Sequence, residues 1–144
     1  MNTKTITLLA ALLLSTTCFA RLGETKDQAA ARYGKPVKCE PESGAECCTY
    51  NAARFTIKCY FIDGIVGALL VSTPDKTPFS EDEITVLQNA NSGGSAWIKQ
   101  LGQPQGVWQW DRADGKAWMT IARGDAMLIE SAEWRAHKKG MDKF

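Results

Sequence analysis

Residues 55–72 decide the fold, and they read FTIKCYFIDGIVGALLVS. The first part of this stretch alternates between apolar and more polar side chains, which is typical of a strand that buries one face. Asp63-Gly64 is a strong signal for a two-residue hairpin turn, and the apolar residues 65–72 follow it as the return strand. We therefore predict a β-hairpin. One face of its first strand would carry Phe55, Ile57, Cys59 and Phe61, and the other Thr56, Lys58 and Tyr60.

The second half of the chain has a similar pattern. Residues 107–111 and 117–121 alternate on either side of Asp114-Gly115, and Gly124-Asp125 leads into an apolar run at 126–131. These signals predict a three-stranded antiparallel meander. By strand parity, the buried face would carry Trp108, Trp110, Ala117, Met119 and Ile121, and the opposite face Gln109, Trp118 and Thr120.

Two capping boxes predict where helices begin. The motif T-x-x-Q at 25–28 precedes good helix formers and indicates a helix over about 26–33. The motif S-x-x-E at 80–83 opens a second helix that ends near the glycines at 93–94. The polar segment 38–46 is expected to be a loop.

The spacing of these signals suggests an internal repeat. The two capping boxes lie 55 positions apart and the two Asp-Gly turns 51 apart. We therefore predict an α+β fold made of tandem helix-plus-antiparallel-meander repeats, at about 21–73 and 80–132, within one domain over 21–144. The helices would lie on one face of the sheet, and residues 133–144 would form a polar tail.

The N-terminal segment has the layout of a secretory signal peptide. A short basic start leads into an apolar run at 6–14 and then into small residues, with cleavage expected after Ala20. The protein is therefore expected to be exported, to the periplasm or to the medium. Cys18 is an alternative site of lipid modification, although Ser15 and Thr17 fit such a site poorly.

Four cysteines remain once the leader is removed, and an even number in an exported chain indicates disulfides. They are Cys39, Cys47, Cys48 and Cys59. A bridge between the adjacent Cys47 and Cys48 would be strained. Two pairings therefore stay open: Cys39–Cys47 with Cys48–Cys59, or Cys39–Cys48 with Cys47–Cys59.

Composition excludes several functional classes. Without Lys4 of the leader, 16 basic residues balance 16 acidic ones, which excludes charge-driven binding to nucleic acid or to an anionic membrane. No apolar run reaches the ~18 residues of a membrane span. The single histidine, His137, lies in a basic tail, and no catalytic, metal-binding or cofactor-binding motif occurs. We expect a protein that is not an enzyme and needs no cofactor.

Two stretches near the start of the predicted mature chain carry a resemblance to known families. Gly23-x-Thr25-x-x-Gln28 with Gly34-x-Pro36 resembles the opening motif of the small outer-membrane-assembly lipoproteins of the SmpA/OmlA type. The strings at 21–25 and 32–36 also resemble the start of small exported bacterial proteins of unassigned function. The tandem layout is similar to the beta-lactamase-inhibitor protein fold. The chain departs from the lipoproteins in lacking a good lipidation site.

The sheet face opposite the helices is the predicted binding surface. It would carry Lys58, Tyr60, Gln109 and Trp118, a mixture of aromatic and polar side chains that is enriched at protein interfaces. The resemblance to the inhibitor fold implies that a partner docks on this open face. The expected function is a binding or assembly module for another extracytoplasmic protein. The alternative is a small extracytoplasmic hydrolase or carbohydrate-binding protein that uses surface aromatics.

Overall fold

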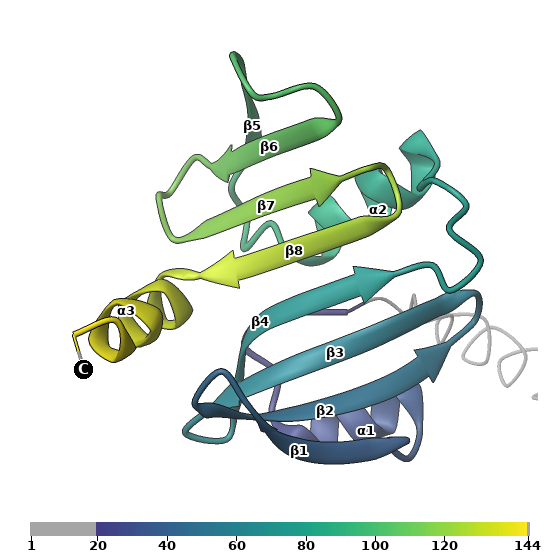
Figure 1. Cartoon of the computed structure of the whole chain (residues 1–144), viewed down its shortest axis with the longest axis vertical. Coiled ribbons are helices and arrows are strands. Elements are labelled where there is room, and N and C mark those ends of the chain that lie inside the picture. The colour runs from purple at the N-terminus through teal and green to yellow at the C-terminus, as the bar shows by residue number, and fades with distance from the viewer. Residues whose placement is uncertain (1–19, 144) are drawn as a thin grey trace, which may run out of the picture.

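The computed structural model describes residues 20–143, and within them it shows one eight-stranded antiparallel sheet and three helices (Figure 1). In chain order the elements are α1 (Lys26–Tyr33), β1 (Lys38–Glu42), β2 (Ala45–Ala52), β3 (Phe55–Ile62), β4 (Ile65–Ser72), α2 (Glu81–Ala90), β5 (Trp97–Gln100), β6 (Val107–Arg112), β7 (Ala117–Ala122), β8 (Ala126–Ser131) and α3 (Ala132–Met141). The strand order is β1-β2-β3-β4-β8-β7-β6-β5, so β4 and β8 meet in the middle. The predicted α+β class is confirmed.

The predicted hairpin forms β3 and β4. Asp63 and Gly64 both have positive φ, 50° and 78°, as the twist of a two-residue hairpin turn requires. The two strands pair antiparallel, with one bulge between Tyr60 and Phe61. The strands on either side of the later turns, β6 to β8, also form an antiparallel meander, as predicted.

Both predicted helix starts are confirmed, because each capping box is complete. The Thr25 hydroxyl accepts from the Gln28 N–H, and the Gln28 side chain accepts from the Thr25 N–H at 2.9 Å. Ser80 and Glu83 make the same reciprocal pair at the start of α2. Arg54 donates to Glu83 at 2.9 Å and thereby ties α2 to the turn before β3.

The two edge strands form where local sequence signals are weak. Residues 38–42, expected in a loop, form the edge strand β1, which turns into β2 at Ser43-Gly44. The four residues of β5 form the opposite edge. An edge strand is exposed on one side and does not need an alternating apolar pattern, which is why residues 38–42 read as a loop.

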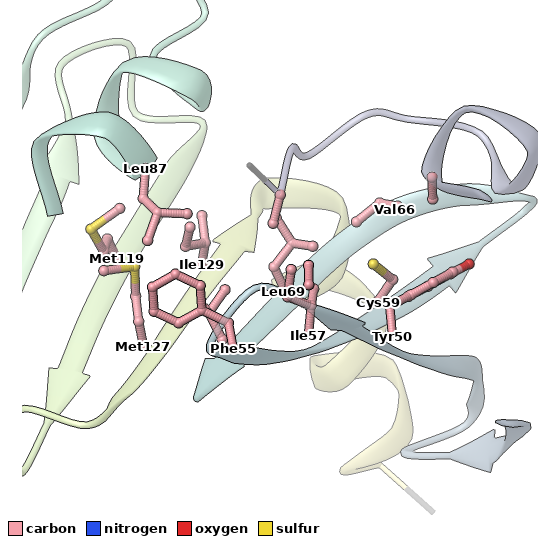
Figure 2. Close-up of a cluster of buried hydrophobic side chains, with 14 of the residues drawn as sticks. Tyr50, Phe55, Ile57, Cys59, Val66, Leu69, Leu87, Met119, Met127 and Ile129 are labelled. Carbon is pink, nitrogen blue, oxygen red and sulfur yellow. The ribbon is translucent and has the colours of Figure 1, made fainter. Parts of the chain in front are cut away.

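The main core lies between the sheet and the helices α1 and α2 (Figure 2). Leu87 of α2 packs above Met119 and Ile129, while Val66 and Tyr50 lie on the α1 side (Figure 2). The predicted parity holds on this face, because Trp110 pairs with Met119 and Trp108 with Ile121. The core therefore forms on the side that the alternating pattern indicates.

The third helix corrects two predictions. Residues 133–141, expected within a polar tail, belong to α3, and α3 packs on the sheet face opposite α1 and α2. The helices therefore do not all lie on one face. Trp134 anchors α3 in a second buried cluster with Cys47, Tyr60 and Ala68. The apolar residues Trp134 and Met141 lie seven positions apart, on one face of a helix, but the basic residues between them hide this signal in the sequence.

Ala20, the last residue of the predicted leader, contacts the folded part of the chain. Ala20 is buried, and its carbonyl accepts a hydrogen bond of 2.8 Å from the Asn91 side chain. The Asn91 side chain also accepts from the Leu22 N–H at 2.7 Å. Ala20 therefore makes a tertiary contact, and the rest of the predicted leader, residues 1–19, lies outside the described residues. Among the helices within residues 20–143, none has the length and apolar character needed to cross a membrane.

Candidate functional site

The predicted binding face is partly covered by α3. Tyr60 is 7% exposed and its ring lies 5.1 Å from the ring of Trp134. The Arg135 guanidinium lies 3.8 Å from the centre of the Trp118 ring, a cation–π arrangement. Burial raises the pKa of the Tyr60 hydroxyl. These two aromatic side chains are therefore occupied by α3 rather than presented as an open surface.

The other two predicted site residues are not covered in this way, but they lie far apart. Lys58 on β3 and Gln109 on β6 share the outer face and are separated by β4, β8 and β7. The ammonium of Lys58 pairs with Glu42 at 3.2 Å, and the Gln109 side chain donates to Asp111 at 3.3 Å. The structure therefore places all four predicted residues on one face without bringing them together into one site.

The strongest candidate site lies on the other face, in a groove between α2 and the strands β5 to β7. Its volume is about 480 Å³. Apolar side chains form much of it, with polar ones at the sides. The lining residues include Phe79, Ile84, Gln88, Lys99, Trp108, Trp110 and Ile121. An apolar concavity with a few polar groups is the usual form of a ligand site.

Particular contacts hold this groove in shape. The Trp97 indole N–H donates to the Gln88 carbonyl at 2.8 Å and so attaches β5 to the C-terminal part of α2. Lys99 lies 5.9 Å from the centre of the Trp110 ring. Trp110 packs against the core, whereas Trp108 is 40% exposed. The Trp97 contact thus fixes β5 against α2 beside the groove, and Trp108 gives the groove an accessible ring.

The edge strand beside the groove is also apolar and exposed. Ile98 is 52% exposed and Leu101, just after β5, is 90% exposed. Continuing the β5–β6 register places Leu101 opposite Trp108. A free strand edge, the exposed Leu101 and the exposed Trp108 therefore lie together on the groove side, whereas Ile98 pairs with Asp111 and lies on the outer face. Strand alternation in the sequence places Trp108 on the α2 side of the sheet. Only the tertiary structure shows that α2 leaves its side chain partly uncovered.

The four cysteines within residues 20–143 form one bridge in place of the two predicted. Cys39 and Cys48 are joined, with their Cα atoms 4.1 Å apart, and Cys47 and Cys59 are free thiols. A Cys47–Cys59 bridge is excluded because these residues belong to clusters on opposite faces of the sheet. Burial, as the main cause, raises the pKa of Cys47 to about 11 and that of Cys59 to about 12. Both thiols are therefore protonated at neutral pH.

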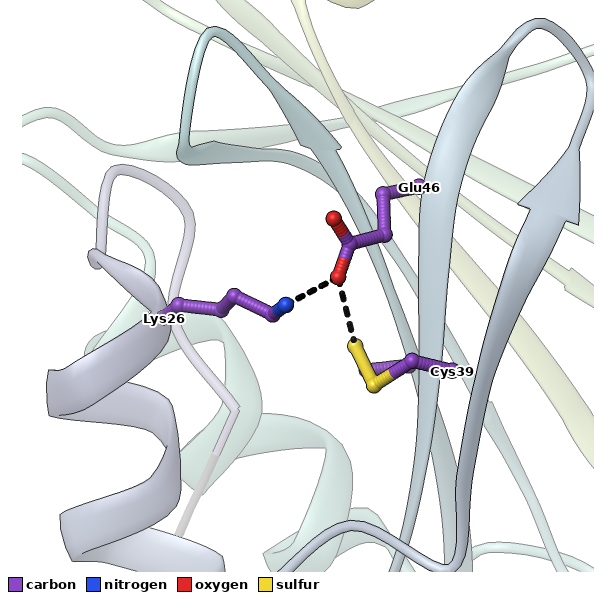
Figure 3. Close-up of a disulfide and its surroundings, with 4 residues drawn as sticks. Lys26, Cys39 and Glu46 are labelled. Atoms are coloured by element: carbon purple, nitrogen blue, oxygen red, sulfur yellow. Dashed lines mark hydrogen bonds and ion pairs between the residues drawn. A yellow bond between two sulfur atoms is a disulfide. The ribbon is translucent and has the colours of Figure 1, made fainter.

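A charged pair lies beside the disulfide. The Glu46 carboxylate is 3.5 Å from the Cys48 sulfur and makes an ion pair with Lys26 of α1 (Figure 3). Cys39, Glu46 and Cys48 place their sulfur and oxygen atoms within 4.8 Å of one another. Because the two sulfurs are bonded to each other, neither offers a thiolate to a metal ion.

His137 lies away from the tryptophan groove. Its ring is 5.5 Å from that of Trp134, and Nε2 lies 3.3 Å from the Ser43 carbonyl oxygen. These contacts connect α3 to the β1–β2 turn. His137 therefore has a structural role in the packing of α3.

Comparisons with known proteins do not assign a function to this groove. No protein-family model matches the chain, and no curated protein matches it significantly. Among solved structures, the chain is similar to an extracellular protein containing an SCP domain from Bacillus anthracis str. Ames, with 14% sequence identity and a TM-score of 0.48. The similarity covers 82% of this chain and 46% of that one, so the chain spans about half of that protein's length. Function must therefore be inferred from the residues themselves.

Proposed function

We propose that this chain is an exported, non-enzymatic binding module that holds an extended segment of another extracytoplasmic protein along β5. The supporting observation is that the free edge of β5 lies directly beside the tryptophan groove. A segment added as a ninth strand would gain main-chain hydrogen bonds from β5, and alternate side chains could enter the groove. Trp108 and Leu101 would be its main apolar contacts.

Export is part of the same proposal. It rests on the leader-like sequence before Ala20 and on the Cys39–Cys48 bridge, since stable disulfides belong to oxidising compartments. We also take α1 with β1–β4 and α2 with β5–β8 as two structural repeats. Each half is one helix followed by four strands, and the last strands of the two halves pair with each other. In this arrangement, β1 and β5 become corresponding edges.

The two edges differ in a way that favours β5 as the docking strand. The β1 edge carries Pro41 and several charged residues, and its Cys39 is bonded to β2. Proline and charge on an edge strand oppose further strand pairing. The β5 edge has only Lys99 as a charged residue, next to Ile98. Strand addition is therefore favoured at β5.

Selection of binders from a random-peptide display library, using the purified exported protein, tests the proposal. We expect a selected peptide to slow amide hydrogen exchange in β5. Trp108→Ala should weaken binding by about 30-fold, the effect of losing one central aromatic contact. Val37→Ala removes an exposed aliphatic side chain next to the opposite edge and should leave affinity unchanged. Protection on the outer face around Lys58 and Gln109, with β5 unprotected, would show that the proposed site is wrong.

A carbohydrate ligand is the second candidate, and the accessible ring of Trp108 favours it. Gln88, Thr85 and Lys99 line the same groove and supply hydrogen-bonding groups. Titration with neutral oligosaccharides separates the two candidates. Binding that depends on Trp108 but leaves exchange in β5 unchanged would favour the sugar over the peptide.

A further inference from the structure

Three cysteines lie in one row across the first three strands. Cys39 on β1 is the direct register partner of Cys48 on β2, and Cys48 is the direct partner of Cys59 on β3. Directly opposed residues on antiparallel strands point to the same face, with Cβ atoms about 4.5–5.5 Å apart, close to disulfide reach. Cys48 therefore lies between two possible partners. It is bonded to the exposed Cys39, while the buried Cys59 is free.

We propose that Cys48 is a shared sulfur that exchanges between two bridges, Cys39–Cys48 and Cys48–Cys59. The Cys59 thiol loses its proton, and its thiolate attacks the Cys48 sulfur. The Cys48–Cys59 bond forms as the Cys39–Cys48 bond breaks, and Cys39 leaves as a thiolate that takes up a proton. No oxidant or reductant is consumed, because one disulfide and one thiol are present before and after.

The fourth cysteine of the described residues, Cys47, cannot take part in this exchange. Cys47 lies on the opposite face, in the cluster with Tyr60 and Trp134. Its main-chain neighbour on β1 is Glu40 rather than another cysteine. Cys47 is therefore a natural control, since it is a buried free thiol of the same segment without a disulfide in reach.

The exchange would expose a reactive thiol on the surface of the protein. The starting bridge holds the edge strand β1 to β2, whereas the second bridge lies between two inner strands. Cys39 would become an exposed thiol at the wall of a cavity of about 750 Å³ that Glu46 and His137 also line. Such a thiol could then attack a disulfide in another molecule, which the buried Cys59 cannot reach.

The balance between the two forms should depend on pH. An exposed thiol at Cys39 would ionise near the ordinary value of about 8.5, whereas burial raises the pKa of Cys59 to about 12. Between these values the released Cys39 thiol is ionised and the Cys59 thiol is not, so each unit of pH favours the exchanged form about tenfold. The charged groups around the row are Lys26, Lys38, Glu40 and Glu46 near Cys39, and Glu24 near Cys59. The Lys26–Glu46 and Lys38–Glu40 ion pairs leave little net charge beside Cys39.

Alkylation of the native protein tests the exchange. The purified oxidised protein is held under argon with iodoacetamide at pH 7.0 and at pH 9.5, quenched with acid, and mapped by peptide mass spectrometry. We expect Cys39 to be alkylated at least ten times faster at pH 9.5, together with a peptide cross-linked through Cys48 and Cys59. An unmodified Cys39 at both pH values overturns the proposal.

Three variants make the result specific. Cys59→Ala should keep Cys39 unmodified, whereas Cys47→Ala should leave the rate of Cys39 modification unchanged. If Cys39 is modified as fast in Cys59→Ala as in the wild type, the bridge opens by another route and the proposal is wrong. Cys39→Ala, made in an oxidising compartment, should contain the Cys48–Cys59 bridge and leave Cys47 as the free thiol of residues 47–59. Free thiols at both Cys48 and Cys59 in that folded variant would also overturn it.

Discussion

Trp134→Ala should release α3 from the sheet and uncover the outer face. Trp134 is 4% exposed, and its ring packs against those of Tyr60 and His137. A tryptophan buries about 150–250 Å², which corresponds to about 4–6 kcal/mol as an upper value at ~25 cal/mol per Å². Because α3 lies at the surface and its neighbours can relax into the gap, we expect a loss of about 3 kcal/mol, the lower end for Trp→Ala.

Urea unfolding and a titration of Tyr60 measure the two consequences. At a slope of about 1.5–2 kcal/mol/M, the unfolding midpoint should fall by about 1.5–2 M. Burial now raises the pKa of Tyr60, so release of α3 should bring that pKa down toward its ordinary value. Lys139→Ala, at an exposed position of α3, is the control and should change neither quantity. An unchanged midpoint with an unchanged Tyr60 titration would refute the anchoring role of Trp134.

Two further stability predictions concern groups that hold α2. The Arg54 guanidinium, as the main cause, lowers the pKa of Glu83 to about 2, so the pair stabilises the fold above about pH 4.3 and this contribution is lost as the pH falls toward 2. Glu83→Gln should therefore flatten the stability profile between pH 5 and 2, by about 1–2 kcal/mol in urea titrations, and an unaltered acid limb would contradict this. Asn91→Ala should cost about 2–3 kcal/mol, because its buried side chain bonds Ala20, Leu22 and Leu87, and thermal unfolding at neutral pH measures this loss. A shift in melting temperature of less than about 2 °C would contradict it.

The sequence predicts the parts of the fold that local chemistry determines. The capping boxes at Thr25 and Ser80 and the turn at Asp63-Gly64 need only a few neighbouring residues, and all three are confirmed. The parity that pairs Trp110 with Met119 follows in the same way from strict alternation along β6 and β7. These features are local, so one sequence is enough to find them.

The features that were missed depend on contacts between distant segments. The β1 edge forms because residues 38–42 pair with β2, and its own sequence is polar with a proline. The α3 helix is held on the sheet because Trp134 packs against Tyr60 and Ala68, which lie more than sixty positions earlier in the chain. The basic residues of α3 make this segment look like a polar tail in the sequence. In the structure, two of them, Arg135 and Lys138, pair with the buried Glu130 of β8. The covering of Tyr60 and Trp118 by α3 follows from these long-range contacts, which local patterns do not carry.

The position of the candidate groove follows from the widths of the elements. A helix with its side chains is about 10 Å wide, and strands lie about 4.8 Å apart, so one helix covers about two strands. The two helices α1 and α2 therefore cover about half of an eight-stranded face. In the middle of that face, side chains of the sheet pack against one another and are buried, among them Phe55, Leu69 and Met127 (Figure 2). Helix α2 contacts β5 through Gln88 and Trp97 but leaves Trp108 of β6 40% exposed. An apolar groove and the free edge of β5 therefore lie side by side, where the proposed segment would bind.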